Sequence, residues 1–451
     1  MVHRSAEQIG RTELGPRSLP PLGAPRTPSA PPSVDTVLGS GLRVIAVRRS
    51  AVPMVELRLE IPFGGTHRTH PARAELLADT LLHGTAQRDR FAIDKVLAGI
   101  GGDLSAGVDP QHLSVSGSAL ASGLDVLLEV LGDALTSASY ATANVVRERD
   151  RLVERLMVNR SQPRVVAREA LQRRRYGKHP FVREWPHADD VAAVTPSAVC
   201  ALHRRSVVPG GAVLVLVGDI DPSRAVELVE SVLSGWKSDH PATELATLPK
   251  LTGAPLQLVH REGAVQSQLR LSAQAVPRNH DQYPALQLAN LVFGGFFSSR
   301  WVENIREGKG YTYGAHCGFE FTRHGATLVA DADTASEVTA AALLETRYEL
   351  GRLVVVPPDE SEVDTARRYA IGSMTIAAAS QRGLASNLAT LATVGLDLGW
   401  LLEHPARLQA VTVGQVAEAA AEFFAPTNFT GVVVGDAKRL ADPLTALGAI
   451  S

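Results

Sequence analysis

From residue 37 onward, apolar residues recur along this chain with two different periods, one of two residues and one of three to four residues. Apolar residues at every second position predict half-buried strands at Leu42–Arg48 and Val55–Pro62. Apolar residues three and four apart predict helices at Ala72–His83 and Asn144–Asn159. The same patterns predict further helices at Phe91–Ile100, Leu124–Leu135 and Pro222–Ser234, and further strands at Asp103–Ala106, Leu113–Ala119 and Gly211–Val217. Interleaved strands and helices of this kind indicate an α+β fold.

The order of elements starts again in the second half of the chain. The segment Glu56-Leu57-Arg58-Leu59 is echoed 212 residues later by Gln268-Leu269-Arg270-Leu271, and each half closes on a strand that ends in Gly-Asp, at 218–219 and 435–436. Two copies of one α+β unit explain this repetition. The predicted organisation is a disordered Pro-rich tail at 1–35, an N-terminal domain at 36–236, a linker at 237–254 and a C-terminal domain at 255–451.

Composition and charge narrow the class of protein. The chain has 45 Lys and Arg against 47 Asp and Glu, and a net charge of −2 favours neither nucleic acid nor an anionic membrane surface as a partner. No apolar run reaches the ~20 residues of a membrane helix. The tail has no apolar core of a signal peptide, and with only Cys200 and Cys317 the chain fits a reducing compartment, so a cytoplasmic location is expected.

The first predicted helix carries a recognisable segment, Arg-Ala-Glu-Leu-Leu-Ala-Asp-Thr-Leu-Leu-His-Gly-Thr at 73–85. It resembles the active-site helix of the pitrilysin/insulinase zinc metallopeptidases, in which His-x-x-Glu-His precedes Gly-Thr. His179-Pro180-Phe181 and the segment from Arg306 to Tyr313 extend the resemblance, which spans residues 37 to about 435. It implies two homologous α+β domains, each a mixed β-sheet backed by helices, arranged as a clamshell.

The zinc motif itself is degenerate in this sequence. In the family, two histidines one helical turn apart bind zinc, and the glutamate between them is the general base. The histidine positions are Glu75 and Asp79 here, the base position is Ala78, and the register of the third ligand, a glutamate in the family, falls on Arg155. We therefore expect no catalytic residue, no zinc and no other cofactor in this chain.

Another use of the same helix stays open. Glu75, Asp79 and His83 are spaced i, i+4 and i+8, which places them on one face of a helix that continues to residue 83. Two carboxylates and an imidazole are a possible metal-ligand set, and a solvated or partner-facing acidic face is the alternative.

A second pair of residues matches the family in the C-terminal half. The resemblance implies that an Arg and a Tyr seven positions apart bind substrate, and Arg306 and Tyr313 have this spacing. A guanidinium offers several donors to a peptide carbonyl, and a phenol can donate to a developing oxyanion. Tyr311, two residues away and expected on the same strand face, is the competing candidate.

The resemblance therefore suggests a non-catalytic, substrate-binding subunit of a heteromeric zinc metallopeptidase. A zinc-bearing homologous subunit would be its partner and would hold the zinc, and a peptide would be the substrate. Two alternatives remain. One is a structural or assembly role, which the resemblance to core subunits of respiratory cytochrome complexes implies, and the other is a peptide-binding protein without a peptidase partner.

Overall fold

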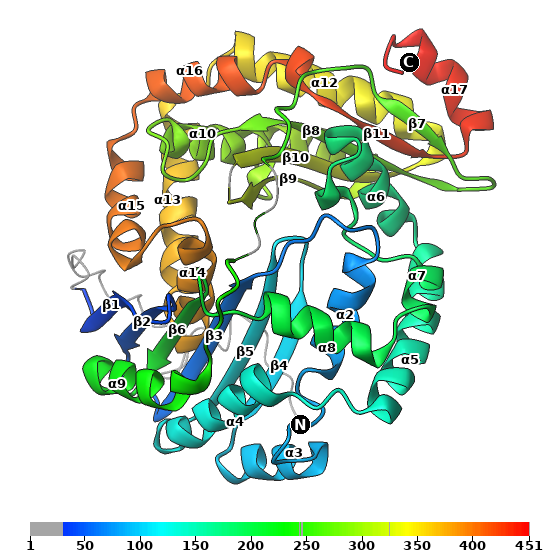
Figure 1. The fold of residues 1–451 in the computed structure, drawn as a ribbon. Helices are drawn as coiled ribbons and strands as arrows, with labels where there is room; N and C mark the ends of the chain where they lie inside the picture. Colours follow the sequence, from blue (N-terminus) through cyan, green and yellow to red (C-terminus); the bar gives the residue numbers. More distant parts are fainter. Residues whose placement is uncertain (1–29, 243, 245–246, 324, 451) are drawn as a thin grey trace, which may run out of the picture. The chain divides into compact units, whose positions relative to one another are not determined.

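The computed structural model describes residues 30–242, 244, 247–323 and 325–450. Two mixed β-sheets organise this part of the chain (Figure 1). The first sheet has the order β1 (Ser33–Val37), β2 (Arg43–Arg48), β6 (Val213–Gly218), β3 (Met54–Pro62), β5 (His112–Leu120), β4 (Asp103–Val108). The second has the order β7 (Gln257–His260), β11 (Thr430–Gly435), β8 (Gln266–Ala275), β10 (Gly325–Ala335), β9 (Thr312–Thr322). Apart from β1, the two orders are the same.

The echoed tetrapeptides occupy equivalent places in the two sheets. On β3, Arg58 donates hydrogen bonds to the carbonyl of Leu57 at 2.7 Å and to the carboxylate of Glu56 at 2.9 Å. On β8, Arg270 makes the same bonds to the carbonyl of the preceding Leu at 2.9 Å and to the amide oxygen of Gln268 at 2.7 Å. The repeat seen in the sequence is therefore a repeat of hydrogen-bonding geometry.

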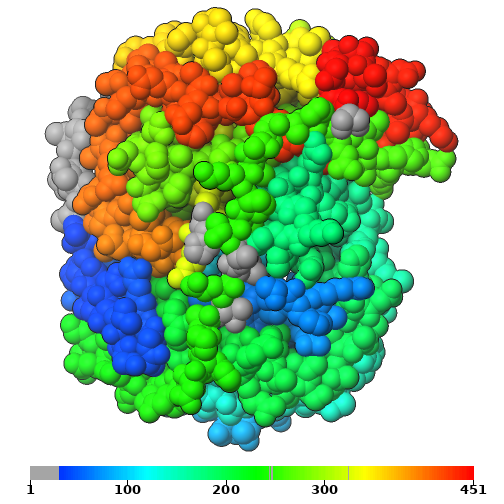
Figure 2. Space-filling model, turned by 45° about the horizontal axis from the view of Figure 1, so that its top comes forward, coloured from blue at the N-terminus to red at the C-terminus, as the bar shows by residue number. Residues whose placement is uncertain are grey.

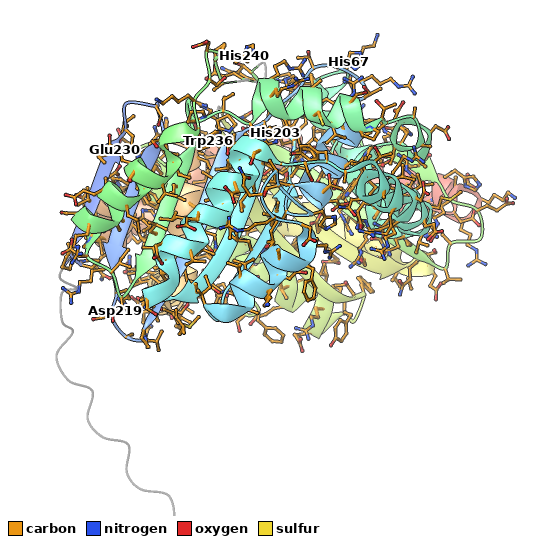
Figure 3. All side chains as sticks on the ribbon, turned by 60° about the horizontal axis from the view of Figure 1, so that its bottom comes forward. His67, His203, Asp219, Glu230, Trp236 and His240 are labelled. Carbon is orange, nitrogen blue, oxygen red and sulfur yellow. The ribbon has the colours of Figure 1, made fainter. Side chains whose placement is uncertain are left out.

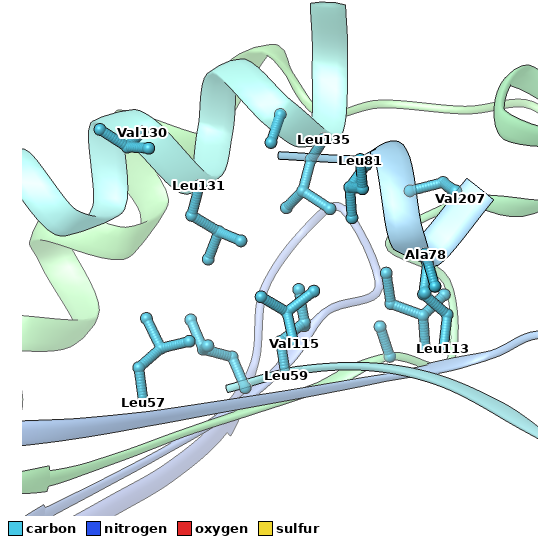
Figure 4. Packing of buried hydrophobic residues seen from close by; sticks show 14 of the residues in the cluster. Leu57, Leu59, Ala78, Leu81, Leu113, Val115, Val130, Leu131, Leu135 and Val207 are labelled. Carbon is cyan, nitrogen blue, oxygen red and sulfur yellow. The ribbon is translucent and has the colours of Figure 1, made fainter. Parts of the chain in front are cut away.

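Helices back one face of each sheet. On the first sheet these are α2 (His70–Thr80), α3 (Arg90–Gly99), α4 (Leu124–Ser137), α5 (Thr142–Arg160), α7 (Ala188–Ala192), α8 (Pro196–Ser206) and α9 (Pro222–Val232). On the second they are α10 (Tyr283–Asn290), α12 (Thr339–Val355), α13 (Glu360–Ala377), α16 (Val413–Phe423) and α17 (Ala437–Ala446). Figure 4 shows the first of these cores, where leucines of α4 meet Leu57 and Leu59 of β3.

The opposite face of each sheet is covered by a helix from the other half of the chain. Helix α14 (Gln381–Thr393) lies on β6 and β3 of the first sheet, and α6 (Pro163–Tyr176) lies on β11 and β8 of the second (Figure 1). Figure 2 shows the orange atoms of the α14 and α15 (Leu398–Ala410) region directly against the blue atoms of the first strands. The strands β6 and β11 are therefore buried on both faces.

Successive side chains of a strand point to opposite faces of the sheet, which explains this double burial. Along β6, Leu214 and Leu216 join the core with α4, whereas Val213, Val215 and Val217 face α14. A strand that is apolar at every position belongs between two layers.

Most predicted strands and helices agree with the structure within a few residues, and two differences matter. Strand β1 begins at Ser33, inside the segment predicted to be disordered, because Asp35 pairs bidentately with Arg43 on β2 at 2.7–2.9 Å. Residues 1–29 of that predicted tail lie outside the described residues. Helices α6 to α8 and α13 to α16 were not predicted at all.

The first half ends on a buried tryptophan. Trp236 donates its indole N–H to the carbonyl of Val207 at 3.0 Å, and Figure 3 places it among the helices, with His240 at the outer margin. The domain boundaries predicted at 236 and 255 stay predictions. None of the helices in the described ranges combines the length and the apolar content of a membrane span.

Candidate functional site

The helix α2 presents the degenerate zinc positions. Pro71 stands in the first turn of α2, where the backbone N–H that proline lacks would have no partner within the helix. The buried side chains of Leu76 and Leu77 pack this helix against the sheet. Asp79 then faces helix α5, where the Nη2 of Arg155 donates to its Oδ2 at 2.9 Å. Two positions at which the family places zinc ligands are thus joined by an ion pair.

Glu75 lies one turn before Asp79 on the same helix. The pKa of its carboxyl is raised from 4.5 to about 7, mainly by burial and secondly by the negative charge of Asp79, against the opposing charge of Arg155. Near neutral pH this group therefore exchanges a proton readily, which an ordinary surface glutamate does not.

Ala78, at the position of the general base, faces the core. Its side chain is 5% exposed and packs beside Leu113 and Val207 (Figure 4). A methyl group cannot accept a proton, so the α2 face has no group between Glu75 and Asp79 that could activate water.

His83 lies beyond the end of α2. The helix ends at Thr80, so the prediction that it continues to residue 83 was wrong. The charge of Asp79 still acts on the His83 imidazole. The His83 Nδ1 lies 4.0 Å from a carboxylate oxygen of Glu148 on α5.

These residues do not fit zinc. Within the described ranges, no group of three or more His, Cys, Asp or Glu side chains is placed to hold a metal ion. Zinc sites need neutral imidazole, thiolate or carboxylate ligands, whereas here a permanent guanidinium cation lies 2.9 Å from one of the two carboxylates.

Arg306 and Tyr313 lie close together. Arg306 sits in the π-helical turn Glu303–Gly308, and its guanidinium carbon lies 5.7 Å from the ring centroid of Tyr313 and 4.3 Å from that of Phe297. The cation is thus held between two aromatic rings. Phe297 was missed from the sequence, where its only signal is the run Gly-Gly-Phe-Phe at 294–297.

A β-bulge directs Tyr313 outward. Thr312 pairs with Thr334 and Ala315 with Ala332, so Tyr313 and Gly314 together stand opposite the single residue Asp333. Bulges of this kind re-aim side chains at sheet edges and functional sites. The Tyr313 side chain is 93% exposed.

A glycine turn and a hydrogen bond fix the start of β9. Gly310, with φ +65°, makes the turn that leads into the strand, and the buried hydroxyl of Thr312 lies 2.7 Å from the carbonyl oxygen of Asp333. Tyr311 precedes β9 and was wrongly expected on its face. The geometry therefore favours Tyr313 over Tyr311 as the partner of Arg306.

The structure thus forms two clusters, one on each half. Glu75, Asp79 and Arg155 meet between α2 and α5, and Arg306 and Tyr313 meet at the edge strand β9. No recorded contact in the described part of the chain links the two clusters.

Two family models match this chain in succession. The model described as Insulinase (Peptidase family M16) matches residues 43–185, and the model described as Peptidase M16 inactive domain matches residues 193–369. The first match holds the degenerate zinc positions, and the second holds Arg306 and Tyr313.

Curated relatives are distant in sequence. An uncharacterised zinc protease of Mycobacterium leprae is 24% identical over 303 residues, 65% of this chain and 67% of the relative. Subunit 1 of the mitochondrial cytochrome b-c1 complex of Bos taurus is 22% identical over 273 residues, 59% of this chain and 56% of that subunit.

Solved structures share the fold over most of the chain. A peptidase M16 inactive domain from Pseudomonas fluorescens superposes with a TM-score of 0.81 at 23% identity, over 90% of this chain and 98% of that one. A protease from Helicobacter pylori superposes with a TM-score of 0.82 at 19% identity, over 90% and 100%. These likenesses confirm the predicted fold class of two homologous sheet-and-helix units arranged as a clamshell.

Proposed function

We propose, from the premise that this chain belongs to the pitrilysin/insulinase family of peptidases, that it is a non-catalytic, peptide-binding subunit that works with a zinc-bearing relative. The relative would supply zinc and the general base, and this chain would supply Arg306 and Tyr313.

The observation that carries the proposal is the contrast between the two clusters. At the zinc positions an Arg155–Asp79 ion pair and a core-facing Ala78 replace every group that the chemistry needs. At the other cluster, Arg306 is retained between two rings and Tyr313 is 93% exposed. Phe297, the second ring against Arg306, is also exposed, so two aromatic side chains form an exposed group beside a β-bulge, which is typical of a surface that binds a ligand.

The exposed pair has a clear chemical use. The Arg306 guanidinium can donate to a peptide carbonyl in the ground state, and the Tyr313 hydroxyl can donate to an oxygen on which negative charge develops. Strand β9 is a sheet edge, so an extended peptide can add to it through main-chain hydrogen bonds beside both side chains.

The test is reconstitution with a relative that has an intact His-x-x-Glu-His motif, identified by co-purification from the native cell. Tyr313→Phe removes one donor and should lower kcat by about 10²–10³, whereas Arg306→Ala should also raise KM. Tyr348→Phe is the matched control, because Tyr348 is an exposed tyrosine on α12, and it should leave activity unchanged. All three variants should still form the complex.

Metal analysis separates this proposal from a self-sufficient enzyme. The isolated chain should carry no stoichiometric zinc and should cleave no peptide, even with zinc added. One tightly bound zinc per chain, lost in Glu75→Ala, would refute the proposal.

A structural role is the second candidate, and the similarity to subunit 1 of the bovine cytochrome b-c1 complex favours it. If the reconstituted complex keeps full activity in both Tyr313→Phe and Arg306→Ala, or if the co-purifying partners include no peptidase, this second candidate becomes the better one.

A further inference from the structure

A cavity of about 280 Å³ lies beyond the N-terminal end of α2, where that helix meets α6, α7 and the end of α5. Pro71, one helical turn before Glu75, forms part of its wall, so the cavity is separate from the Asp79–Arg155 pair but adjoins the same helix. Its size suits a single amino-acid residue or a small anion rather than a large cofactor.

The charge in this cavity is unbalanced. Four arginines line it, against two carboxylates, Glu169 and Asp190. The arginines are Arg68, Arg160, Arg173 and Arg183. Glu169 is shared between two of them at 3.4 and 3.5 Å, and Asp190 lies 3.3 Å from a third. The charged side chains that line the cavity therefore sum to a net positive charge.

One guanidinium of this wall stands outside the ion pairs. Among the described residues, Arg183 has no carboxylate within ion-pair distance, and its recorded hydrogen bond is to the carbonyl of Thr66 at 2.9 Å. An oxyanion in the cavity can therefore pair with Arg183 without displacing a carboxylate.

The remaining wall is mostly apolar and aromatic. Val182, Trp185 and Pro186 line the cavity together with the imidazole of His187. Guanidinium groups beside a flat aromatic wall suit a ligand with an oxyanion at one end and an apolar portion at the other.

We propose that this cavity, the arginine pocket, is a binding site for a carboxylate or phosphate group. The charge excess attracts the anion, Arg183 supplies donors that no carboxylate occupies, and Trp185 contacts the rest of the ligand. Glu169 pairs with Arg160 and Arg173, and Asp190 pairs with Arg68, so two carboxylates hold three arginines in place without cancelling the charge. The proposal concerns the single chain, so its failure would leave the peptidase-subunit proposal untouched.

Trp185 provides the readout. It is the only one of the four tryptophans that is not buried, since Trp236, Trp301 and Trp400 are each less than 10% exposed. Titration of the full chain should change the tryptophan fluorescence, and Trp185→Phe should abolish that change. Calorimetry measures the affinity independently. The probes are inorganic phosphate, an N-acetylated tripeptide with a free C-terminal carboxylate, and the same tripeptide as its C-terminal amide.

Matched charge removals test the site. Arg183→Gln should weaken binding about tenfold or more, because a hydrogen bond to a charged group is lost. Arg173→Gln, with a side chain already largely exposed, should weaken it without endangering the fold. Arg164→Gln removes one charge from the same helix outside the cavity and should leave binding unchanged.

Each outcome decides the matter. Binding of the acid but not the amide identifies a peptide carboxylate as the ligand, and binding of phosphate alone identifies a phosphate-bearing molecule. No binding of any probe at millimolar concentration, or equal weakening by Arg164→Gln and Arg183→Gln, would overturn the arginine pocket.

Discussion

Replacing Glu75 by glutamine should stabilise the protein at alkaline pH and leave it unchanged at acidic pH. Burial, reinforced by Asp79, raises the pKa of this carboxyl from 4.5 to about 7. Between these values the folded protein holds a proton that the unfolded chain has released, so the free energy of unfolding falls as the pH rises through this window. Above pH 7 the folded state carries the whole cost of a poorly solvated charge.

The size of the effect follows from the same values. A rise from 4.5 to about 7 corresponds to ~3 kcal/mol at ~1.4 kcal/mol per pH unit. Because the side chain keeps some contact with solvent, we expect Glu75→Gln to gain about 1–3 kcal/mol at pH 9 and close to nothing at pH 4.

Urea unfolding of both proteins at pH 4, 7 and 9 measures this difference. Glu154→Gln, on the exposed side of α5, removes the same charge without relieving burial and is the matched control. If Glu75→Gln destabilises the protein at pH 9, the carboxylate is ionised and stabilised by a cation such as Arg155, and the reasoning that burial dominates its pKa fails.

Three further predictions follow from packing and backbone geometry. A double-mutant cycle of Asp79→Ala and Arg155→Ala should give a coupling of no more than ~1 kcal/mol, since the two side chains are 26% and 51% exposed; a larger value would show a buried network. Leu388→Ala on α14, fully buried, should cost about 2–5 kcal/mol, whereas Leu344→Ala on the exposed face of α12 should cost less than ~0.5 kcal/mol, both measured by urea unfolding. Gly310→Ala must force a φ of +65° on alanine and should cost about 1–2 kcal/mol, with reduced activity of the reconstituted complex because the turn that leads to Tyr313 shifts.

The strands could be predicted from the alternation of apolar and polar residues, and the duplication of the α+β unit could be predicted from the repeated order of elements. The family resemblance singled out Arg306 and Tyr313, which lie close together in the structure, and the register that placed Arg155 at a zinc-ligand position is consistent with its contact to Asp79. These features depend on local periodicity or on one family motif.

Features that depend on tertiary contacts were not readable. His83 was misplaced because periodicity does not show that α2 ends at Thr80. The bulge at Tyr313 requires knowledge of the pairing between β9 and β10. Amphipathic segments such as α6 and α14 reveal an apolar face but not which sheet that face covers.

The exchange of α6 and α14 between the halves constrains how the chain can be made. The outer face of the first sheet, with Ile45 and Val215, is covered by α14, which is synthesised only when residues 381–393 are reached. Helix α6 in turn packs on β11, which is synthesised only at Thr430–Gly435. Domains normally fold as units while the ribosome is still adding residues, and contacts this far apart in sequence slow folding. The first half cannot complete its fold while it is the only part synthesised, so a nascent chain exposes the outer face of the first sheet until α14 emerges and the apolar face of α6 until β11 emerges. Expression of the halves as separate polypeptides should succeed only when both are produced together.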